Sequence, residues 1–323
     1  MTQPSVKFSV VVALLAWVAG CTTPKSPVPA TEPVAASRAD WPRHVLALDD
    51  FWRLNPPLPG QRFDASGLAF LPSGELLVVN NLDRRLHLVR FGDTPHEADL
   101  VPWPGGFSAA QLRPFAAGKR GAWDFEGLAV DEAGRVYVSE EGNYQVLRLN
   151  PAGGAVERLP LDWRGAGLNP LREDPNASLE GVAVGGGRLY VAKERGPARL
   201  FAFHDRTFAF AESWVVRPSR SGLALHYSDL AWCDGALYVL LRHQRCVLKV
   251  DPARGGVRAE YDFRELERRP EFAYRRDYAT GVMEGLAVDA THFWLVTDNN
   301  GLARRADAAD SRPTLFRCPR PDL

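Results

Sequence analysis

The chain has 323 residues, and its 39 Lys and Arg are balanced by 39 Asp and Glu, so the formal net charge is zero. This balance excludes the strongly basic character on which nonspecific nucleic-acid binding depends, and we expect no nucleic-acid partner. The 28 glycines and 25 prolines indicate many short strands joined by turns.

Residues 1–20 have the pattern of a secretory signal peptide. Lys7 precedes an uncharged apolar run from Phe8 to Ala19, which is shorter than the roughly 20 residues that span a bilayer. The run ends in VAGC, which resembles the lipobox of bacterial lipoproteins; the alternative is an ordinary signal peptide with a chance cysteine. The resemblance implies that Cys21 carries the lipid, including an acyl group such as palmitate. Thr22 replaces the Asp of an inner-membrane retention signal, so we expect an outer-membrane anchor facing the periplasm.

The residues after Cys21 predict a flexible tether rather than a folded segment. Residues 23–39 are rich in Pro, Ala, Ser and Thr and contain few large apolar side chains. We therefore expect a lipidated tether over residues 21–42 and a folded domain over residues 43–318.

One sequence unit recurs five times along this domain. Each copy is an apolar strand, a tight turn and a second apolar strand, and the copies read DASGLAFLPSGELLVVNN from Asp64, DFEGLAVDEAGRVYVSEE from Asp124, SLEGVAVGGGRLYVAKE from Ser178, YSDLAWCDGALYVLLR from Tyr227 and VMEGLAVDATHFWLVTD from Val282. A third strand follows each copy, and the middle copies have a fourth. The repeats predict an all-β propeller of five four-stranded blades. Six blades are the alternative if a long connection hides a degenerate one.

The last unit has no fourth strand of its own after the strand at Thr314. The segment HVLALDD from His44 is predicted to supply it, which closes the ring by pairing the N- and C-terminal strands. The repeats also place Cys233 and Cys246 at turns on opposite ends of one blade, beyond disulfide reach. We expect both, and Cys318, to be free thiols.

The repeat alignment places two columns of polar residues at one end of the propeller. The position that starts each first strand is occupied by Ser66, Glu126, Glu180, Ser228 and Glu284. The position that ends each second strand is occupied by Asn81, Glu141, Glu194, Arg242 and Asp298. Neighbouring carboxylates repel each other unless a cation such as Ca²⁺ or an arginine compensates them. The alternative is that each glutamate only accepts backbone N–H groups and fixes its blade.

The repeated EGLAVD motif, followed by a glycine turn, YV and EE, resembles the phytase-like esterase family, as does SDLAW at 228–232. It equally resembles the related SdiA-regulated propeller family. The resemblance spans about residues 44–318 and implies a propeller with esterase or phosphoesterase activity. In propeller lactonases, a glutamate before a glycine on an inner strand binds a divalent cation, and Glu126, Glu180 and Glu284 match that local pattern. The acidic calcium-site motifs of true propeller phytases are absent from the sequence, which argues against phytate as the substrate.

Two hypotheses of function follow. The first is a metal-assisted hydrolase with Ca²⁺ as cofactor: the predicted metal ligands are Glu126, Glu180, Glu284 and Asp298, the predicted catalytic carboxylates are Glu141 and Glu194, and the predicted anion-binding residues are Arg195, Arg242 and Asn81. The second is a non-catalytic propeller that binds a ligand or protein of the cell envelope. In either case we expect a monomer, and an anionic small molecule or an envelope component as its partner.

Overall fold

The computed structural model describes residues 41–115, 123–150, 154–174, 176–220, 222–275 and 280–321. The chain from Arg38 to Leu323 forms one unit, built almost entirely of strands. The other unit, Met1–Ser37, contains the predicted signal peptide and Cys21 and lies outside the described residues, as does most of the predicted tether.

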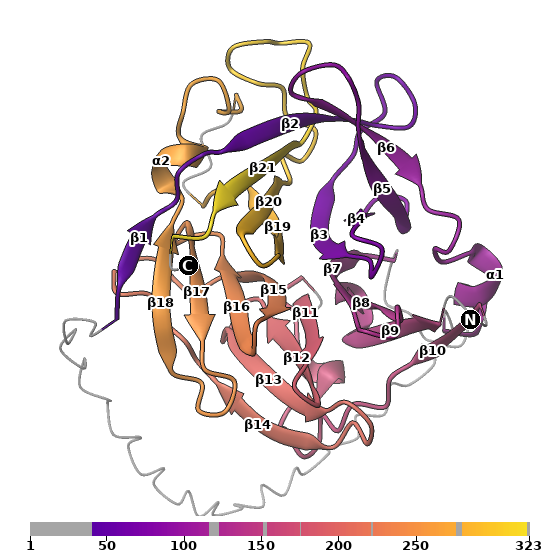
Figure 1. The fold of residues 1–323 in the computed structure, drawn as a ribbon. Helices are drawn as coiled ribbons and strands as arrows, with labels where there is room; N and C mark the ends of the chain where they lie inside the picture. The colour runs from indigo at the N-terminus through magenta and orange to yellow at the C-terminus, as the bar shows by residue number, and fades with distance from the viewer. Residues whose placement is uncertain are drawn as a thin grey trace, which may run out of the picture. The chain divides into compact units, whose positions relative to one another are not determined.

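Four blades are formed by consecutive strands that pair in antiparallel order (Figure 1). The first comprises β3 (Ala65–Phe70), β4 (Leu76–Asn80), β5 (Arg85–Phe91) and β6 (Glu97–Pro102). The second comprises β7 (Phe125–Val130), β8 (Val136–Glu140), β9 (Gln145–Asn150) and β10 (Ala155–Arg158). The third comprises β11 (Leu179–Gly185), β12 (Arg188–Lys193), β13 (Arg199–His204) and β14 (Phe210–Trp214). The fourth comprises β15 (Tyr227–Cys233), β16 (Ala236–Leu241), β17 (Cys246–Val250) and β18 (Val257–Asp262).

The fifth blade joins the two ends of the folded chain. It comprises β19 (Met283–Val288), β20 (His292–Thr297), β21 (Thr314–Pro319) and the N-terminal strand β2 (Asp50–Asn55), which pairs antiparallel with β21. β2 also pairs in parallel with β6, so the fifth and first blades form one eight-stranded sheet. The predictions of five blades and of closure by the N-terminal strand are therefore confirmed.

The prediction that residues 44–50 close the ring was right only for Asp49 and Asp50, which pair with Arg317 of β21. His44 lies in β1 (Arg43–Val45), which pairs in parallel with β18 at the outer edge of the fourth blade. Val45 in β1 is 69% exposed, whereas Leu54 in β2 is fully buried. The strand that closes the ring is the one whose apolar side chains can be buried between the fifth and first blades.

The hydrophobic core is divided into five clusters, each between two neighbouring blades. Leu54, Leu76 and Val296, for example, belong to the cluster between the first and fifth blades. Helical segments are short in the described residues: α1 (Ala109–Leu112), α2 (Arg264–Glu267) and single turns at Arg113–Phe115, Glu141–Asn143 and Pro170–Arg172. None of the described helices has the length and apolarity needed to cross a membrane.

The first strands of the blades form a closed inner ring, in which β3 contacts β7, β7 contacts β11, β11 contacts β15, β15 contacts β19 and β19 contacts β3. Glycines allow this close approach. A Cβ atom added to Gly67 would lie 2.5 Å from the carbonyl oxygen of Glu126, and one added to Gly127 would lie 2.4 Å from that of Glu180. The glycine of the EGLAV motif is therefore required by the contact between inner strands.

The three cysteines of the folded domain are free thiols. Cys233 is opposite Ala236 at one end of β16, and Cys246 is opposite Leu241 at the other end. The register places these two thiols at opposite ends of the blade, as the repeat alignment predicted.

Candidate functional site

Two columns of side chains meet at one end of the propeller, which we call the acidic mouth. The first column is the second residue of each inner strand: Ser66, Glu126, Glu180, Ser228 and Glu284. All five inner strands have a register shift at this point, between Ala65 and Gly67 in the first blade and at the equivalent positions in the others. Such a β-bulge turns a side chain away from the regular ladder and is frequent beside functional sites.

The second column follows directly after the second strand of each blade: Asn81, Glu141, Glu194, Arg242 and Asp298. The strand register places this column beside a third one, which precedes each inner strand: Asp64, Asp124, Ser178, His226 and Val282. In four blades, the backbone N–H of the second-column residue donates to the carbonyl oxygen of the third-column residue, for example from Glu141 to Asp124 at 2.9 Å. This bond holds the columns together at the same end of the blade.

The first cluster at the acidic mouth, which we call the carboxylate group, consists of Asp124, Glu126 and Glu141. One oxygen from each lies within 4.8 Å of the others. Burial, followed by the charges of Asp124 and Glu141, raises the pKa of Glu126 well above its usual range. Burial, followed by the charges of Asp124 and Glu194, raises the pKa of Glu141 to about 8. The fold therefore brings three carboxyl groups of the second blade together where water screens them poorly, so that ionising all of them is unfavourable without a cation.

The second cluster, which we call the histidine group, consists of Glu180, Glu194 and His226, again with one potential ligand atom from each within 4.8 Å of the others. His226 Nε2 lies 2.8 Å from Glu194 Oε1. Burial, followed by the charges of Glu126 and Glu194, raises the pKa of Glu180, whereas burial lowers that of His226. The ring of His243 lies 4.2 Å from that of His226, and burial and His226 lower its pKa to about 4.

Arginines compensate two glutamates of the columns. Arg242 Nη1 donates to Glu284 Oε1, and Arg242 Nε donates to the carbonyl oxygen of Gly281 at 3.0 Å. Arg195 Nη1 donates to Glu194 Oε1, while the Arg195 side chain is 43% exposed. Among the described residues, Glu284 belongs neither to the carboxylate group nor to the histidine group, and its charged partner is the guanidinium of Arg242.

Asp298 and Asn81 lie on the other side of the mouth. Asp298 accepts a hydrogen bond from the backbone N–H of Asn300 at 2.7 Å, and burial and the charge of Asp64 raise its pKa to about 7. Asp64 is itself paired with Arg62. Asn81 donates its backbone N–H to the carbonyl oxygen of Asp64, and the side-chain oxygen of Asn81 is buried with no hydrogen-bond partner in the described part of the chain.

The structure therefore divides the four predicted metal ligands. Glu126 lies in the carboxylate group and Glu180 in the histidine group, whereas Glu284 and Asp298 lie outside both groups.

A family model for Phytase-like proteins, described as esterase-like activity of phytase, matches residues 26–301. The chain belongs to the Phytase-like family. The resemblance inferred from the repeated EGLAVD motif is thereby confirmed. A search of curated protein sequences finds no match.

Several solved structures are similar to this Phytase-like protein, and the first of those named here supports the fold alone. Glutaminyl cyclase of Myxococcus xanthus is 17% identical, with a TM-score of 0.56, and the match covers 86% of this chain and 97% of that one. Virginiamycin B lyase of Staphylococcus aureus is 13% identical, with a TM-score of 0.40 over 84% of this chain and 75% of that one. The calcium-binding protein regucalcin of Agrobacterium tumefaciens is 12% identical, with a TM-score of 0.44 over 86% and 96%. Identities this low do not transfer an activity or a ligand.

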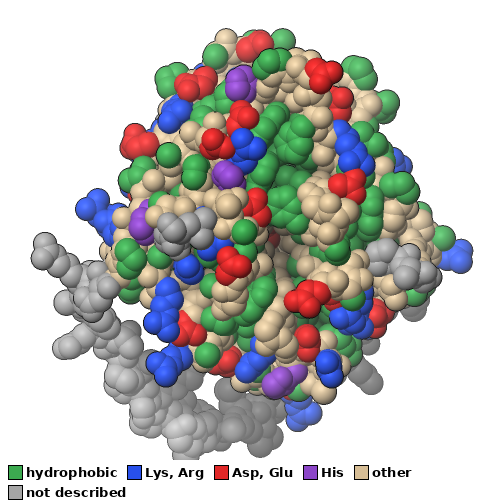
Figure 2. Space-filling view, viewed as in Figure 1, with side chains coloured by type: hydrophobic (Ala, Val, Ile, Leu, Met, Phe, Trp, Pro, Cys, Tyr) green, Lys and Arg blue, Asp and Glu red, His purple; other side chains and the backbone are tan. Residues whose placement is uncertain are grey.

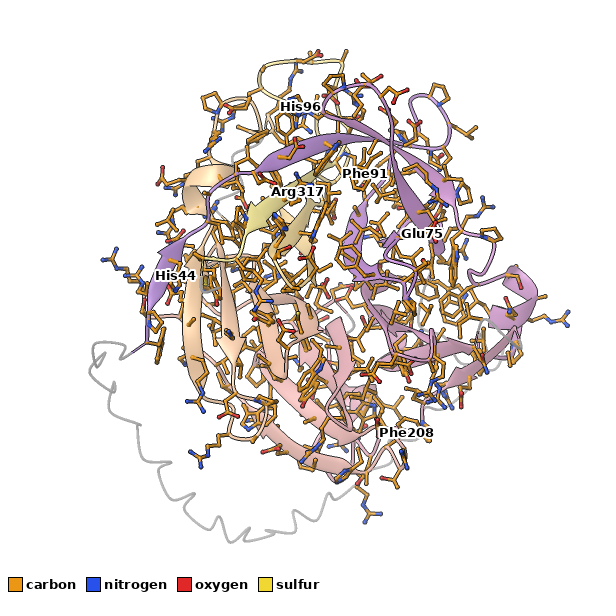
Figure 3. All side chains as sticks on the ribbon, viewed as in Figure 1. His44, Glu75, Phe91, His96, Phe208 and Arg317 are labelled. Carbon is orange, nitrogen blue, oxygen red and sulfur yellow. The ribbon has the colours of Figure 1, made fainter. Side chains whose placement is uncertain are left out.

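The centre of the opposite end of this Phytase-like propeller is apolar, and charged residues such as Asp131 and Arg135 line a second cavity beside it. The inner strands end there around a cavity lined by small and hydrophobic residues such as Ala129, Val184 and Trp232. Figure 2 shows this end, with hydrophobic side chains gathered around the middle of the face. Phe91 and Arg317, labelled in Figure 3, both pack against Trp52 at the joint between the first and fifth blades. In the part of the chain that the structure describes, both clusters of potential metal ligands lie at the acidic mouth.

None of the metal ligands predicted from the sequence belongs to the third column, although this column contributes to both groups. Asp124 and His226 each complete one of the two groups: Asp124 is the first residue of its repeat copy, and His226 directly precedes its copy. The signal in the sequence is positional: the residue directly before each inner strand is polar in four of the five blades. Because the acidic mouth is built from three columns, it places two clusters of potential metal ligands side by side.

Proposed function

We propose that this Phytase-like protein is a hydrolase of phosphoesters or other esters that acts at the acidic mouth with a hard divalent cation such as Ca²⁺. The observation that carries the proposal is the carboxylate group. Three carboxylates, from Asp124, Glu126 and Glu141, present oxygens within 4.8 Å of one another, and Glu126 and Glu141 are each only 9% exposed.

The carboxylate group fits such a cation. Buried like charges destabilise a fold unless they are neutralised, and no arginine or lysine is paired with these three side chains in the described residues. Oxygen-only donors suit Ca²⁺, which takes six to eight of them and can complete its shell with water and backbone carbonyls. When bound, the cation would polarise a phosphoryl or carbonyl oxygen of the substrate and lower the pKa of water.

The residues around the group would orient the substrate and move protons. Burial and the neighbouring carboxylates raise the pKa of Glu141 to about 8, and a cation bound at the carboxylate group would lower it again and leave Glu141 ionised, as a general base at neutral pH requires. Glu194, held by His226 and Arg195, is the second acid–base candidate. Arg195 and Arg242 would hold an anionic substrate group by exchanging their glutamate partners for it, and Asn81 would donate from the opposite side.

We also propose that the propeller is anchored by lipid on Cys21 to the outer membrane, faces the periplasm and acts as a monomer on an anionic small molecule or envelope component. The sequence pattern of residues 1–42 supports this placement. A propeller anchored in this way would hydrolyse esters that enter or arise in the cell envelope.

The hydrolase proposal is tested by assaying the purified full chain against phosphomonoesters, phosphodiesters, carboxylesters and lactones, with Ca²⁺ and with EDTA. We expect turnover of at least one class that requires Ca²⁺. It should fall by about 100-fold or more in Glu126→Gln and Glu141→Gln, in line with the loss of an essential base or ligand.

Glu132→Gln is the matched control. Glu132 is an exposed glutamate of the same blade, in the turn at the opposite end of β7. This variant should retain full turnover. The absence of turnover for every class, or turnover that Glu126→Gln leaves intact, would instead support a non-catalytic binding propeller.

A further inference from the structure

The histidine group differs from the carboxylate group in its donor chemistry. Glu180 lies on the bulge of β11, Glu194 follows β12 and His226 precedes β15, so residues of two neighbouring blades meet there. The three side chains are 9%, 3% and 5% exposed. An imidazole nitrogen and carboxylate oxygens within 4.8 Å of one another form a mixed nitrogen–oxygen donor set.

Several buried polar atoms around this group lack a hydrogen-bond partner among the described residues. They include Glu194 Oε2 and His226 Nδ1, which remain after Glu194 Oε1 is used by His226 and Arg195. Buried polar atoms are almost always partnered in native proteins by protein groups, water or ions, so these two atoms are available to a bound ion or water.

Ser228 adds an independent observation. It is 2% exposed, and its hydroxyl has no partner in the described part of the chain. It occupies the bulge position of the fourth blade, equivalent to Glu180 and Glu284, which places it at the acidic mouth two residues after His226. Ser66, at the equivalent position of the first blade, also has a hydroxyl that is unpartnered among the described residues, and Ser228 is the serine of this column that lies in the same blade as His226.

We propose that the histidine group binds a divalent transition-metal ion of the Zn²⁺ class, with Glu180, Glu194 and His226 as ligands, separately from the carboxylate group. Imidazole is a preferred ligand of Zn²⁺ and its neighbours, whereas Ca²⁺ prefers oxygen alone. Three protein ligands leave a coordination position for water or substrate, the arrangement of catalytic rather than structural zinc sites. The inference builds on the proposed hydrolase function, because both cations would lie at the same mouth.

The test is a titration of the full chain, prepared without a histidine tag, with Co²⁺ as a spectroscopic substitute for Zn²⁺. We expect one Co²⁺ per chain, visible light absorption typical of low-coordinate Co²⁺, and displacement by Zn²⁺. His226→Gln and Glu194→Gln should each weaken binding by roughly 100-fold, since even the loss of an outer partner of a metal ligand costs 10- to 100-fold.

Two variants serve as controls. His204→Gln removes an exposed histidine on another part of the third blade, and Glu126→Gln disables the carboxylate group. Both should retain Co²⁺ binding. Because His226 and Glu194 are buried, circular dichroism is used to check that their variants are folded like wild type. Paramagnetically shifted imidazole proton signals in the NMR spectrum of Co²⁺-loaded wild type report histidine ligation without any variant.

The outcomes separate the two proposals. If wild type shows no stoichiometric Co²⁺ or no shifted imidazole signal, or if folded His226→Gln binds Co²⁺ as wild type does, the histidine site is overturned. If Glu126→Gln also abolishes Co²⁺ binding, the two sites are not separate and the inference is likewise overturned. If Co²⁺ binds as expected while no Ca²⁺-dependent turnover is found, the histidine site stands and the hydrolase proposal fails.

Discussion

Asp229 Oδ2 accepts a hydrogen bond from the backbone N–H of Leu286 at 2.8 Å, so a carboxyl of the fourth blade holds the inner strand of the fifth. Asp229 occupies the position at which the other four blades have glycine, and it is fully buried. Its other oxygen accepts the N–H of Leu230 at 2.8 Å. Burial raises its pKa well above the usual range. The SDLAW variant of the repeated motif therefore replaces close backbone contact with a hydrogen-bonded bridge.

The bridge predicts that Asp229→Asn destabilises the propeller. An amide presents N–H groups where the carboxyl now accepts from backbone N–H, which leaves at least one buried donor unpaired. We expect a loss of about 1–3 kcal/mol in the free energy of unfolding, measured with urea. Asp93→Asn, at an exposed aspartate in the turn before β6, should change it by less than about 0.5 kcal/mol. Equal stability of Asp229→Asn and wild type would contradict the bridge.

The inner ring predicts a severe effect of Gly127→Ala. The added Cβ would lie 2.4 Å from the carbonyl oxygen of Glu180, and backbone of the third blade cannot move without separating the strands. We expect a loss of about 3 kcal/mol or more, or failure to fold. Gly256→Ala is the matched control, because nothing lies within 4 Å of an added Cβ there. Similar melting temperatures for the two variants would mean that the inner strands are not packed as described.

Acid should weaken the ion pairs of Asp310. Burial acts to raise the pKa of Asp310, but hydrogen bonds from Arg312 and the charge of Arg304 outweigh it and lower the pKa to about 2. A carboxyl whose pKa is depressed by folding stabilises the fold above its unfolded value of 3.8, and this stabilisation is lost as the pH falls towards 2.

Asp310→Asn should therefore be less stable than wild type at neutral pH, by about 1–2 kcal/mol after allowance for solvent screening. The difference should shrink between about pH 4 and pH 2, which urea titrations at several pH values would measure. A difference that does not change with pH would contradict the assignment.

The anchor is tested by Cys21→Ser. This change removes the thiol that the lipobox-like sequence offers for lipidation, so the protein should lose metabolic lipid labelling and leave the membrane fraction. Cys233→Ser, which alters a thiol inside the folded domain, should keep both properties. Continued membrane attachment of Cys21→Ser would show that residues 18–21 are not a lipobox.

The architecture was predictable because the repeat has fixed spacing. The same positions of each copy carry Glu126 and Glu141 in one blade and Glu180 and Glu194 in the next, so their common location followed from alignment alone. Which side chains of these columns form ion pairs with one another was not predictable from the sequence. Arg242 lies in the same column as Glu141, yet it reaches the neighbouring blade and pairs with Glu284, which depends on the bulges and on side-chain length. Likewise, β1 and β2 are both plausible edge strands, and only burial against the fifth blade distinguishes them.

The central claim is that the carboxylate group binds a hard cation, and calorimetric titration of EDTA-treated protein with Ca²⁺ tests it most directly. We predict one Ca²⁺ per chain at the carboxylate group, bound by wild type and by Glu132→Gln but not by Glu126→Gln, together with a higher melting temperature of the two binding forms. No binding by wild type, or the same affinity in Glu126→Gln, would contradict the account.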